Sequence, residues 1–206
     1  MIDEPSTPGT LRPGGRTARV RAAVLRAAEE ALVAHGFSGL DLGDLAQRAG
    51  VGRTTVYRRW GSTTALIADL LTDMAEQSLP RTRSGSLTED LRANARLVRR
   101  TLADPRQGAL FRAVLVAAND DPGTAEALRL FYRRRVEEWA PCVTEAVERG
   151  ELPSDTDPSE VIRAVSAPLY YRMLTTADPL DETAADRAAA AAEAAARAGA
   201  YRRTAD

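Results

Sequence analysis

Residues 40–66 read LDLGDLAQRAGVGRTTVYRRWGSTTAL, and this stretch holds two short helical patterns joined by a turn that carries a glycine. Asp41 is a helix-starting residue, and Gly50 is a typical helix stop. The second helix is predicted from about Arg53 to Trp60. Two short helices joined in this way are the pattern of a helix-turn-helix.

The small and branched residues of this stretch each have a steric role. Ala46 is small where the second helix must cross the first closely, and Gly50 permits the positive φ that the turn needs. Val51 and Val56 are expected to lock the two helices together. These choices favour a compact helix-turn-helix over two independent helices.

The second helix carries side chains suited to phosphate oxygens and to base edges in a DNA major groove. The candidate DNA-contacting residues on it are Arg53, Thr54, Thr55, Tyr57, Arg58 and Arg59. Tyr57 is expected to reach a phosphate with its hydroxyl while its ring packs on the preceding helix. The alternative is that this is a solvated arginine-rich face, because helix-turn-helix shapes also occur in proteins that do not bind DNA.

The charge distribution favours the DNA-binding interpretation. The net charge of the chain is only −1, and all of its 28 basic residues are arginine. Residues 12–60 hold nine arginines against four carboxylates, about +5, whereas residues 62–206 are acidic by about −4. A basic module that neutralises phosphates gains affinity through the release of counterions.

The composition of the whole chain predicts an all-α protein. About a fifth of the residues are alanine, and β-branched residues other than Val and Thr are scarce. We expect about nine helices and no strand, with Pro141 kinking the longest helix. The predicted helices span residues 17–35, 41–49, 52–60, 63–77, 87–103, 108–119, 122–149, 158–176 and 181–201. The domains are then a disordered arm at 1–15, an N-terminal three-helix helix-turn-helix DNA-binding domain at 16–61, and a C-terminal helical ligand-binding and dimerisation domain at 62–206.

The chain lacks the residues that several classes of function require. Cys142 is the single cysteine, which excludes an internal disulfide, and His35 is the single histidine, which removes most zinc, di-iron and histidine-dependent catalytic designs. We expect no metal, no cofactor and no enzymatic activity. Cys142 is expected to be a buried apolar residue and His35 a solvent-facing one. No apolar run is long enough to span a membrane, and no secretory signal is readable in residues 1–15, so we expect a cytoplasmic protein without a membrane partner.

The chain resembles the tetracycline-repressor (TetR) family of bacterial transcriptional regulators. The resemblance is strongest over residues 17–70, through Phe37, the turn at 46–51, the TVYRRW run at 55–60 and the helix start at 62–66. A second similarity covers residues 128–176, through ERGEL at 148–152 and APLYYR at 167–172. The resemblance over residues 17–70 implies that one set of side chains faces DNA, namely Arg53, Thr54, Thr55, Tyr57 and Arg58. It also implies that Val51, Val56 and Trp60 pack inside.

The chain departs from the family near the start of the fourth helix. Family members commonly place a lysine there for a DNA phosphate, and this chain has Thr63, followed by Thr64. The phosphate contact is then expected from hydroxyl groups, from the helix N-terminus, or from Arg58 and Arg59. Thr63 is therefore a candidate DNA-binding residue.

The C-terminal part has few large side chains, and these are the candidates for lining a cavity that takes a small molecule. They are Met74, Phe111, Phe131, Trp139, Tyr170 and Met173. The alternative is that they are ordinary core residues. The family forms a four-helix dimer interface from its last two helices, here predicted at residues 158–176 and 181–201, and alanine there would permit close approach.

The resulting hypothesis is a ligand-responsive repressor. As a homodimer it binds a palindromic double-stranded DNA operator and is released by a small apolar or amphipathic effector. Two other hypotheses remain open. A helical enzyme would hold an apolar substrate in the same cavity, and a protein-interaction module would use the helix-turn-helix as a docking scaffold.

Overall fold

The computed structural model describes residues 15–76 and 84–203, and this part of the chain is helical with no β-strand. Its α-helices are α1 (Arg16–His35), α2 (Leu42–Arg48), α3 (Arg53–Arg59), α4 (Thr63–Glu76), α5 (Leu87–Ala103), α6 (Pro105–Asp120), α7 (Pro122–Glu148), α8 (Pro158–Thr175) and α9 (Glu182–Arg197). A single 3-10 turn, η1 (Phe37–Gly39), follows α1. The all-α class and the nine helices are confirmed for the described residues. Residues 1–14 of the predicted arm (1–15) and the last residue predicted for the fourth helix (77) lie outside them.

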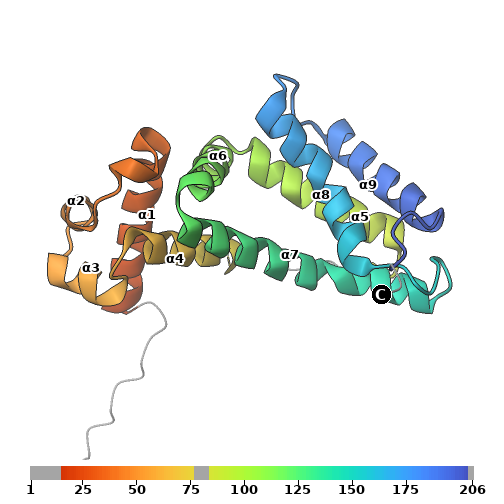
Figure 1. Ribbon diagram of the computed structural model, residues 1–206, viewed down its shortest axis with the longest axis horizontal. Coiled ribbons are helices and arrows are strands. Elements are labelled where there is room, and N and C mark those ends of the chain that lie inside the picture. Colours follow the sequence, from red (N-terminus) through yellow and green to blue (C-terminus); the bar gives the residue numbers. More distant parts are fainter. Residues whose placement is uncertain (1–14, 77–83, 204–206) are drawn as a thin grey trace, which may run out of the picture.

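The molecule is elongated, with its N-terminal helices at one end (Figure 1). Helices α1, α2 and α3 form a head, and α4 packs against the long α7 as both run away from it. At the other end α5, α8 and α9 pack on one another and on the far half of α7. Helix α6 crosses between the two ends and also contacts α1. The head therefore touches the rest of the protein through two helices, α4 and α6.

Most helix boundaries follow the capping residues that the sequence offers. The side chains of Asp41, Ser86, Asp157 and Asp181 each accept a hydrogen bond from a backbone N–H in the first turn of the following helix. Gly50, predicted as the turn residue, has φ +65°. The predicted starts of α2, α5, α8 and α9 are thereby confirmed.

Most predicted boundaries lie within one residue of the observed ones, and two differ by three or more residues. Helix α6 begins at Pro105 and not at residue 108, because Asp104 ends α5 and at the same time accepts hydrogen bonds from the N–H groups of the next helix. Helix α1 begins at Arg16, one residue before the predicted Thr17. Helix α9 ends at Arg197, four residues before the predicted end, and Gly199 with φ +79° follows it.

The buried residues form two core clusters. The first joins the head to α4 and to the near ends of α6 and α7, and includes Leu32, Val56, Leu66 and Leu128. The second lies among α5, α8, α9 and the far half of α7, and it includes Phe111 of α6. The domain division at residue 61 stays a prediction, because the first cluster runs across it.

Alanine controls the packing of α9. Its buried residues are Ala185, Ala188, Ala189, Ala192 and Ala196. Because these side chains are small, α9 lies close to α5 and α8. A good part of the small-residue face predicted for α9 is thus buried inside the subunit.

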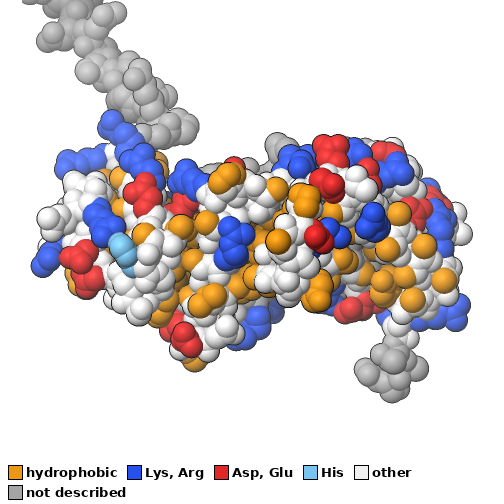
Figure 2. Space-filling view, turned by 90° about the horizontal axis from the view of Figure 1, so that it is seen from above, with side chains coloured by type: hydrophobic (Ala, Val, Ile, Leu, Met, Phe, Trp, Pro, Cys, Tyr) orange, Lys and Arg blue, Asp and Glu red, His pale blue; other side chains and the backbone are white. Residues whose placement is uncertain are grey.

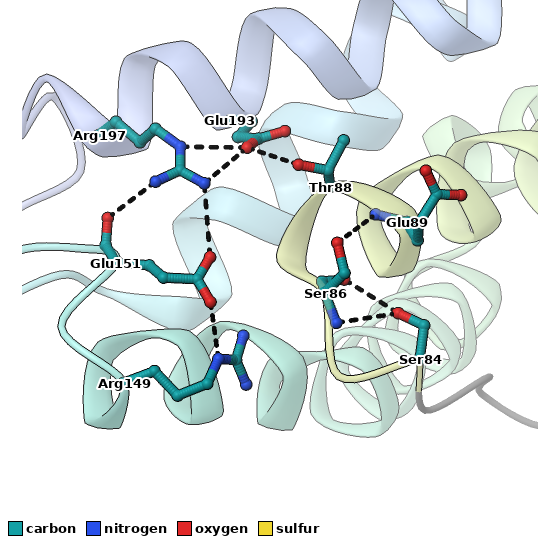
Figure 3. A network of polar contacts seen from close by, with 8 residues as sticks. All are labelled: Ser84, Ser86, Thr88, Glu89, Arg149, Glu151, Glu193 and Arg197. Atoms are coloured by element: carbon teal, nitrogen blue, oxygen red, sulfur yellow. Dashed lines mark hydrogen bonds and ion pairs between the residues drawn. The ribbon is translucent and has the colours of Figure 1, made fainter.

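A polar network fastens the end of α9 to its neighbours (Figure 3). Glu193 accepts from Thr88 of α5 (2.8 Å) and from Arg197 (2.9 Å). The Arg197 guanidinium also reaches the backbone carbonyl of Glu151 at 3.2 Å, and Arg149 donates to the carboxylate of Glu151. Three segments that are far apart in sequence are tied together here, on the side of the molecule away from the head.

The two residues singled out by their rarity lie as expected. Cys142 is 1% exposed within the second core cluster, and His35 is exposed at the end of α1. Within residues 15–76 and 84–203, no helix is long and apolar enough to cross a membrane. The same residues contain no group of three His, Cys, Asp or Glu side chains placed to hold a metal ion.

Candidate functional site

The helix-turn-helix turns one face of α3 inward and leaves the other free. Val56 is fully buried and Trp60, just after α3, is 8% exposed, so these two residues anchor the helix on the first core cluster. Val51 is half-buried against the same cluster, and its N–H donates to the carbonyl of Ala46 at 2.9 Å across the turn. The inward positions implied by the family resemblance are thereby found in the structure.

The candidate DNA-contacting residues lie on the opposite face of α3. Arg53, Thr54, Tyr57, Arg58 and Arg59 are exposed, and Thr55 is half-buried. Tyr57 is 49% exposed, which leaves its ring partly packed and partly in solvent. The space-filling view shows basic side chains gathered over the head end of the molecule (Figure 2). The arrangement offers guanidinium and hydroxyl donors on one convex surface.

Gly43 of α2 gives room to the side chain of Arg53, and it was not predicted from the sequence. A Cβ added at Gly43 would lie 3.1 Å from the guanidinium carbon of Arg53 and 2.9 Å from Oδ1 of Asp41. The Arg53 side chain therefore lies against the backbone of α2, where only glycine leaves this space. Gly43 is buried within α2, which is an unfavourable place for a glycine in terms of helix propensity alone.

The hydroxyl groups of Ser62, Thr63 and Thr64, at the start of α4, make different contacts. Ser62 accepts from the N–H of Ala65 at 3.1 Å and so caps the helix. Thr64 donates to the carboxylate of Asp121 at the start of α7 (3.1 Å), so this hydroxyl joins the start of α4 to α7. Thr63 is half-buried in the first turn of α4 and has no such bond. Of the two threonines, only Thr63 keeps its hydroxyl available for a phosphate.

Asp69 of α4 binds both α1 and the end of α3. Its carboxylate accepts from the guanidinium of Arg21 at 2.8 Å and from the indole N–H of Trp60 at 2.9 Å. Partial burial raises the pKa of Asp69, but the hydrogen bonds from Arg21 and Trp60 outweigh it and hold the pKa below its usual value. Arg21 also pairs with Asp73, and Arg59 stacks over the Trp60 ring with 5.2 Å to its centroid. These contacts fix the orientation of α3 relative to α4.

A cavity of about 790 Å³ lies next to this junction. Its wall is built from α1, α4, α5, α6, α7 and α8. Five of the six predicted residues line it, namely Met74, Phe111, Phe131, Trp139 and Tyr170. Met173 does not. It packs against the second core cluster, because the α8 residues in the wall follow the spacing Ile162, Ser166, Tyr170 and the next position on that stripe is residue 174.

Four aromatic rings form a closed cluster in the cavity wall. Phe111 contacts Phe131 (5.5 Å between centroids) and Tyr170 (6.2 Å), and Tyr132 contacts the same two rings at 5.3 and 5.5 Å. Most of these pairs are edge-to-face, the favoured geometry for aromatic rings. Burial raises the pKa of Tyr132 to about 12 and the pKa of Tyr170 well above its usual value. Both phenols are therefore neutral at physiological pH.

The opposite side of the cavity is charged and belongs partly to the head. Glu29 of α1 is 8% exposed and is paired with Arg106 of α6, and both residues line the cavity. The sequence analysis predicted neither residue, nor Asn94, Tyr132 and Arg135, which also line it. The ion pair with Glu29 holds the pKa of Arg106 above its usual value, despite some burial. A molecule in this cavity lies against the head as well as the C-terminal helices.

The fold and these surfaces define a class of protein, a helix-turn-helix DNA-binding regulator with a helical C-terminal domain. Comparison with known families supports this class. Residues 24–70 match the model described as "Bacterial regulatory proteins, tetR family". Residues 81–192, more than half of the chain, match the model described as "Tetracyclin repressor-like, C-terminal domain". The chain belongs to the tetracycline-repressor family and is a helix-turn-helix transcriptional regulator.

Individual relatives agree with this assignment. The regulator YdeS of Bacillus subtilis is 28% identical over 162 residues, which cover 78% of this chain and 81% of YdeS. The regulator AqdR of Rhodococcus erythropolis is 30% identical over 147 residues, covering 71% of this chain and 70% of AqdR. Among solved structures, the flavonoid-responsive regulator FrrA superposes with a TM-score of 0.66 at 26% identity, covering 91% of this chain and 99% of FrrA.

Proposed function

We propose that this regulator is a dimeric, ligand-responsive repressor that acts in the cytoplasm. It binds a roughly palindromic operator through α3 of each subunit and leaves it when a small apolar or amphipathic molecule fills the cavity. The observation that carries the proposal is the position of the cavity, which is lined by α1 and α4 as well as by helices of the C-terminal domain. A ligand there contacts the elements that orient the DNA-binding head.

The DNA-binding part of the proposal rests on the outer face of α3. Arg53, Thr54, Thr55, Tyr57, Arg58 and Arg59 are proposed to contact the major groove and its phosphates. Thr63, in the first turn of α4, is proposed to contact a phosphate from the helix N-terminus. Two recognition helices related by a dimer axis read half-sites in successive major grooves, which favours a palindromic operator.

The proposed dimer interface is formed by α8 and α9. Tyr171 and Leu174 of α8 are 67% and 52% exposed, and large apolar side chains exposed to that degree are uncommon on this chain. On α9, Ala190 and Ala191 face away from the buried alanine stripe. The space-filling view shows hydrophobic side chains gathered over the half of the molecule that holds these helices (Figure 2). Contiguous exposed apolar surface of this kind favours a protein contact.

Two contacts are proposed to carry the ligand response. The Glu29–Arg106 ion pair joins α1 to α6, and the Thr64–Asp121 hydrogen bond joins α4 to α7. A ligand that separates α6 and α7 would pull on both connections and so change the angle of α3 relative to its counterpart in the dimer. The response needs the ligand to bind one of two head positions better than the other.

The experiment begins with an operator selected from a random DNA pool by the purified dimer, and with compounds that raise its melting temperature. The operator Kd is then measured by fluorescence anisotropy with and without each bound compound. A coupling of the size typical for allostery weakens operator binding about 5- to 150-fold. Glu29→Gln is expected to reduce this ratio. An operator Kd that no bound compound changes would rule out the ligand response.

The same assay separates this function from the two competing ones. Binding through phosphates weakens steeply and linearly in a plot of log Kd against log salt. A protein-docking module would bind no selected DNA and show no such slope. A helical enzyme would consume the compounds that stabilise it, which chromatography of the incubated compounds detects.

A further inference from the structure

Two residues that line the cavity each carry a buried polar atom with no hydrogen-bond partner. These atoms are Oδ1 of Asn94 on α5 and Nε1 of Trp139 on α7, and neither is bonded within residues 15–76 and 84–203. Asn94 is 4% exposed and Trp139 is 2% exposed, and both residues line the cavity of about 790 Å³. An unsatisfied buried polar group is costly and uncommon in folded proteins. Such a pair on residues that line a cavity indicates a bound partner.

The two atoms need hydrogen-bond partners of opposite kinds. Nε1 of Trp139 is a donor only, so it needs an acceptor, and Oδ1 of Asn94 is an acceptor, so it needs a donor. A hydroxyl group provides both functions, since its oxygen accepts and its hydrogen donates. A carboxylate fits less well, because it has no hydrogen to give to Oδ1.

The aromatic residues of the cavity wall favour a ligand with an aromatic ring. Phe111, Phe131, Tyr132 and Tyr170 present the cluster of tilted and edge-to-face rings, which is suited to a further aromatic ring. The Tyr132 and Tyr170 phenols are neutral at physiological pH. The nearest cation on that stretch of α7, Arg135, already pairs with Glu138 at 2.5 Å. This part of the wall therefore offers no free charge to an ionised group.

We propose that Asn94 and Trp139 form a polar subsite that selects hydroxylated aromatic molecules as the effector class of this cavity. The inference rests on the proposed function in so far as it calls the bound molecule an effector. The binding selectivity itself belongs to the cavity and is measurable on the protein without DNA.

The test uses two probes of nearly equal shape, 2-naphthol and 2-methylnaphthalene, whose Kd values for the full-length dimer are measured by equilibrium dialysis. The hydroxyl compound is expected to bind about tenfold more tightly, as one or two net hydrogen bonds would give. Trp139→Phe keeps an aromatic ring and removes the N–H group. Asn94→Leu keeps the size of the side chain and removes the acceptor.

Each variant is expected to remove most of the tenfold preference, and the double variant to reverse it, because an unpaired hydroxyl then loses its hydration on entering the cavity. Binding of 2-methylnaphthalene should change less than twofold in all of them. Asn119→Leu, on the exposed side of α6 and outside the cavity wall, is the matched control and should keep the preference. Circular dichroism confirms that each variant is folded.

Three results would overturn the proposal. They are equal binding of the two probes by the unmodified protein, a preference that survives in both single variants, and no binding of either probe at its solubility limit. The proposed function fails differently. If 2-naphthol binds with the expected selectivity and the operator Kd stays the same, the subsite stands and the ligand response is refuted.

Discussion

The two core clusters of this protein differ in whether certain buried polar groups have hydrogen-bond partners. In the first cluster, the polar groups that enter the interior pair with one another, as Arg21, Trp60 and Asp69 do. In the second cluster, two polar atoms of residues that line the cavity, Asn94 and Trp139, are left without partners.

This difference indicates which region is complete and which is not. A cluster in which an arginine, a carboxylate and an indole N–H bind one another, as Arg21, Asp69 and Trp60 do, holds one geometry, which suits helices that must present α3 to DNA in a fixed orientation. A region with a cavity and unpaired polar atoms gains contacts when a molecule enters it. The contrast is between a head held by paired polar groups and a C-terminal region that contains a cavity.

The largest effect is expected from Arg53→Ala. A specific arginine contact contributes about 1–3 kcal/mol, and a dimer carries two copies, so operator binding should weaken by about 2–6 kcal/mol. Tyr57→Ala should also weaken it strongly. The operator Kd from fluorescence anisotropy measures both, and sedimentation should show an unchanged dimer. Arg112→Ala removes an exposed arginine from α6 and is the control. If Arg53→Ala binds as well as this control, α3 is not the recognition helix.

The next largest effect is expected from Asp69→Ala. The substitution leaves the Trp60 indole N–H without an acceptor and breaks the bidentate contact with Arg21. The free energy of unfolding should fall by about 2 kcal/mol. Asp69→Asn, which keeps an acceptor for Trp60, should lose less. Urea unfolding followed by circular dichroism, at one fixed protein concentration, provides the comparison. Equal stability of all three proteins would show that the first cluster does not depend on this contact.

Gly43→Ala should separate binding from stability. Alanine favours the helix by up to about 1 kcal/mol, but its Cβ also lies 2.9 Å from Oδ1 of Asp41, the cap of α2. The two effects oppose each other, so the stability of the head should change by less than about 1 kcal/mol. The added Cβ lies 3.1 Å from the Arg53 guanidinium and must displace it, which is expected to weaken operator binding about fivefold. The operator Kd is measured by fluorescence anisotropy and the stability by urea unfolding. A variant with unchanged operator affinity would mean that Arg53 does not need its place against α2.

The smallest effect is a difference in pH dependence. Because the pKa of Asp69 is lower in the folded protein than its usual 3.8, the stability it adds is fully present above about pH 4 and is lost as the pH falls through the folded pKa. The gap in urea midpoint between the unmodified protein and Asp69→Asn should therefore be constant from pH 8 to pH 5 and close below pH 4. A gap that closes near neutral pH would point to a different group.

The sequence predicted the features that depend on neighbouring residues. Cap residues such as Asp41 and Ser86 act within one turn, and the period of α3 shows which of its residues face outward. The start of α6 was predicted three residues too late, because one residue, Asp104, both ends α5 and caps α6. Gly43 and the unpaired state of Asn94 depend on side chains distant in sequence, and no local pattern marks them.

The cavity was predicted in part for the same reason. Five of the six large residues named from the sequence lie in its wall, and Met173 does not, because its angular position on α8 was not considered. The contribution of α1 to the wall was not foreseen. It follows from α6 packing against the head, a contact between elements that are about 70 residues apart in sequence.

The chain has two tryptophans, and each lies in a different core cluster. Trp60 touches the carboxylate that orients α3, and Trp139 lies in the cavity wall with its N–H free. The protein thus carries two natural fluorophores, one for each half of its mechanism. Because Trp139→Phe would remove the proposed subsite and Trp60→Phe the hydrogen bond to Asp69, the emission is followed in the unmodified protein. There, cavity filling alters the surroundings of Trp139 and head movement those of Trp60. The order of these two events after rapid mixing can then be timed without any attached label.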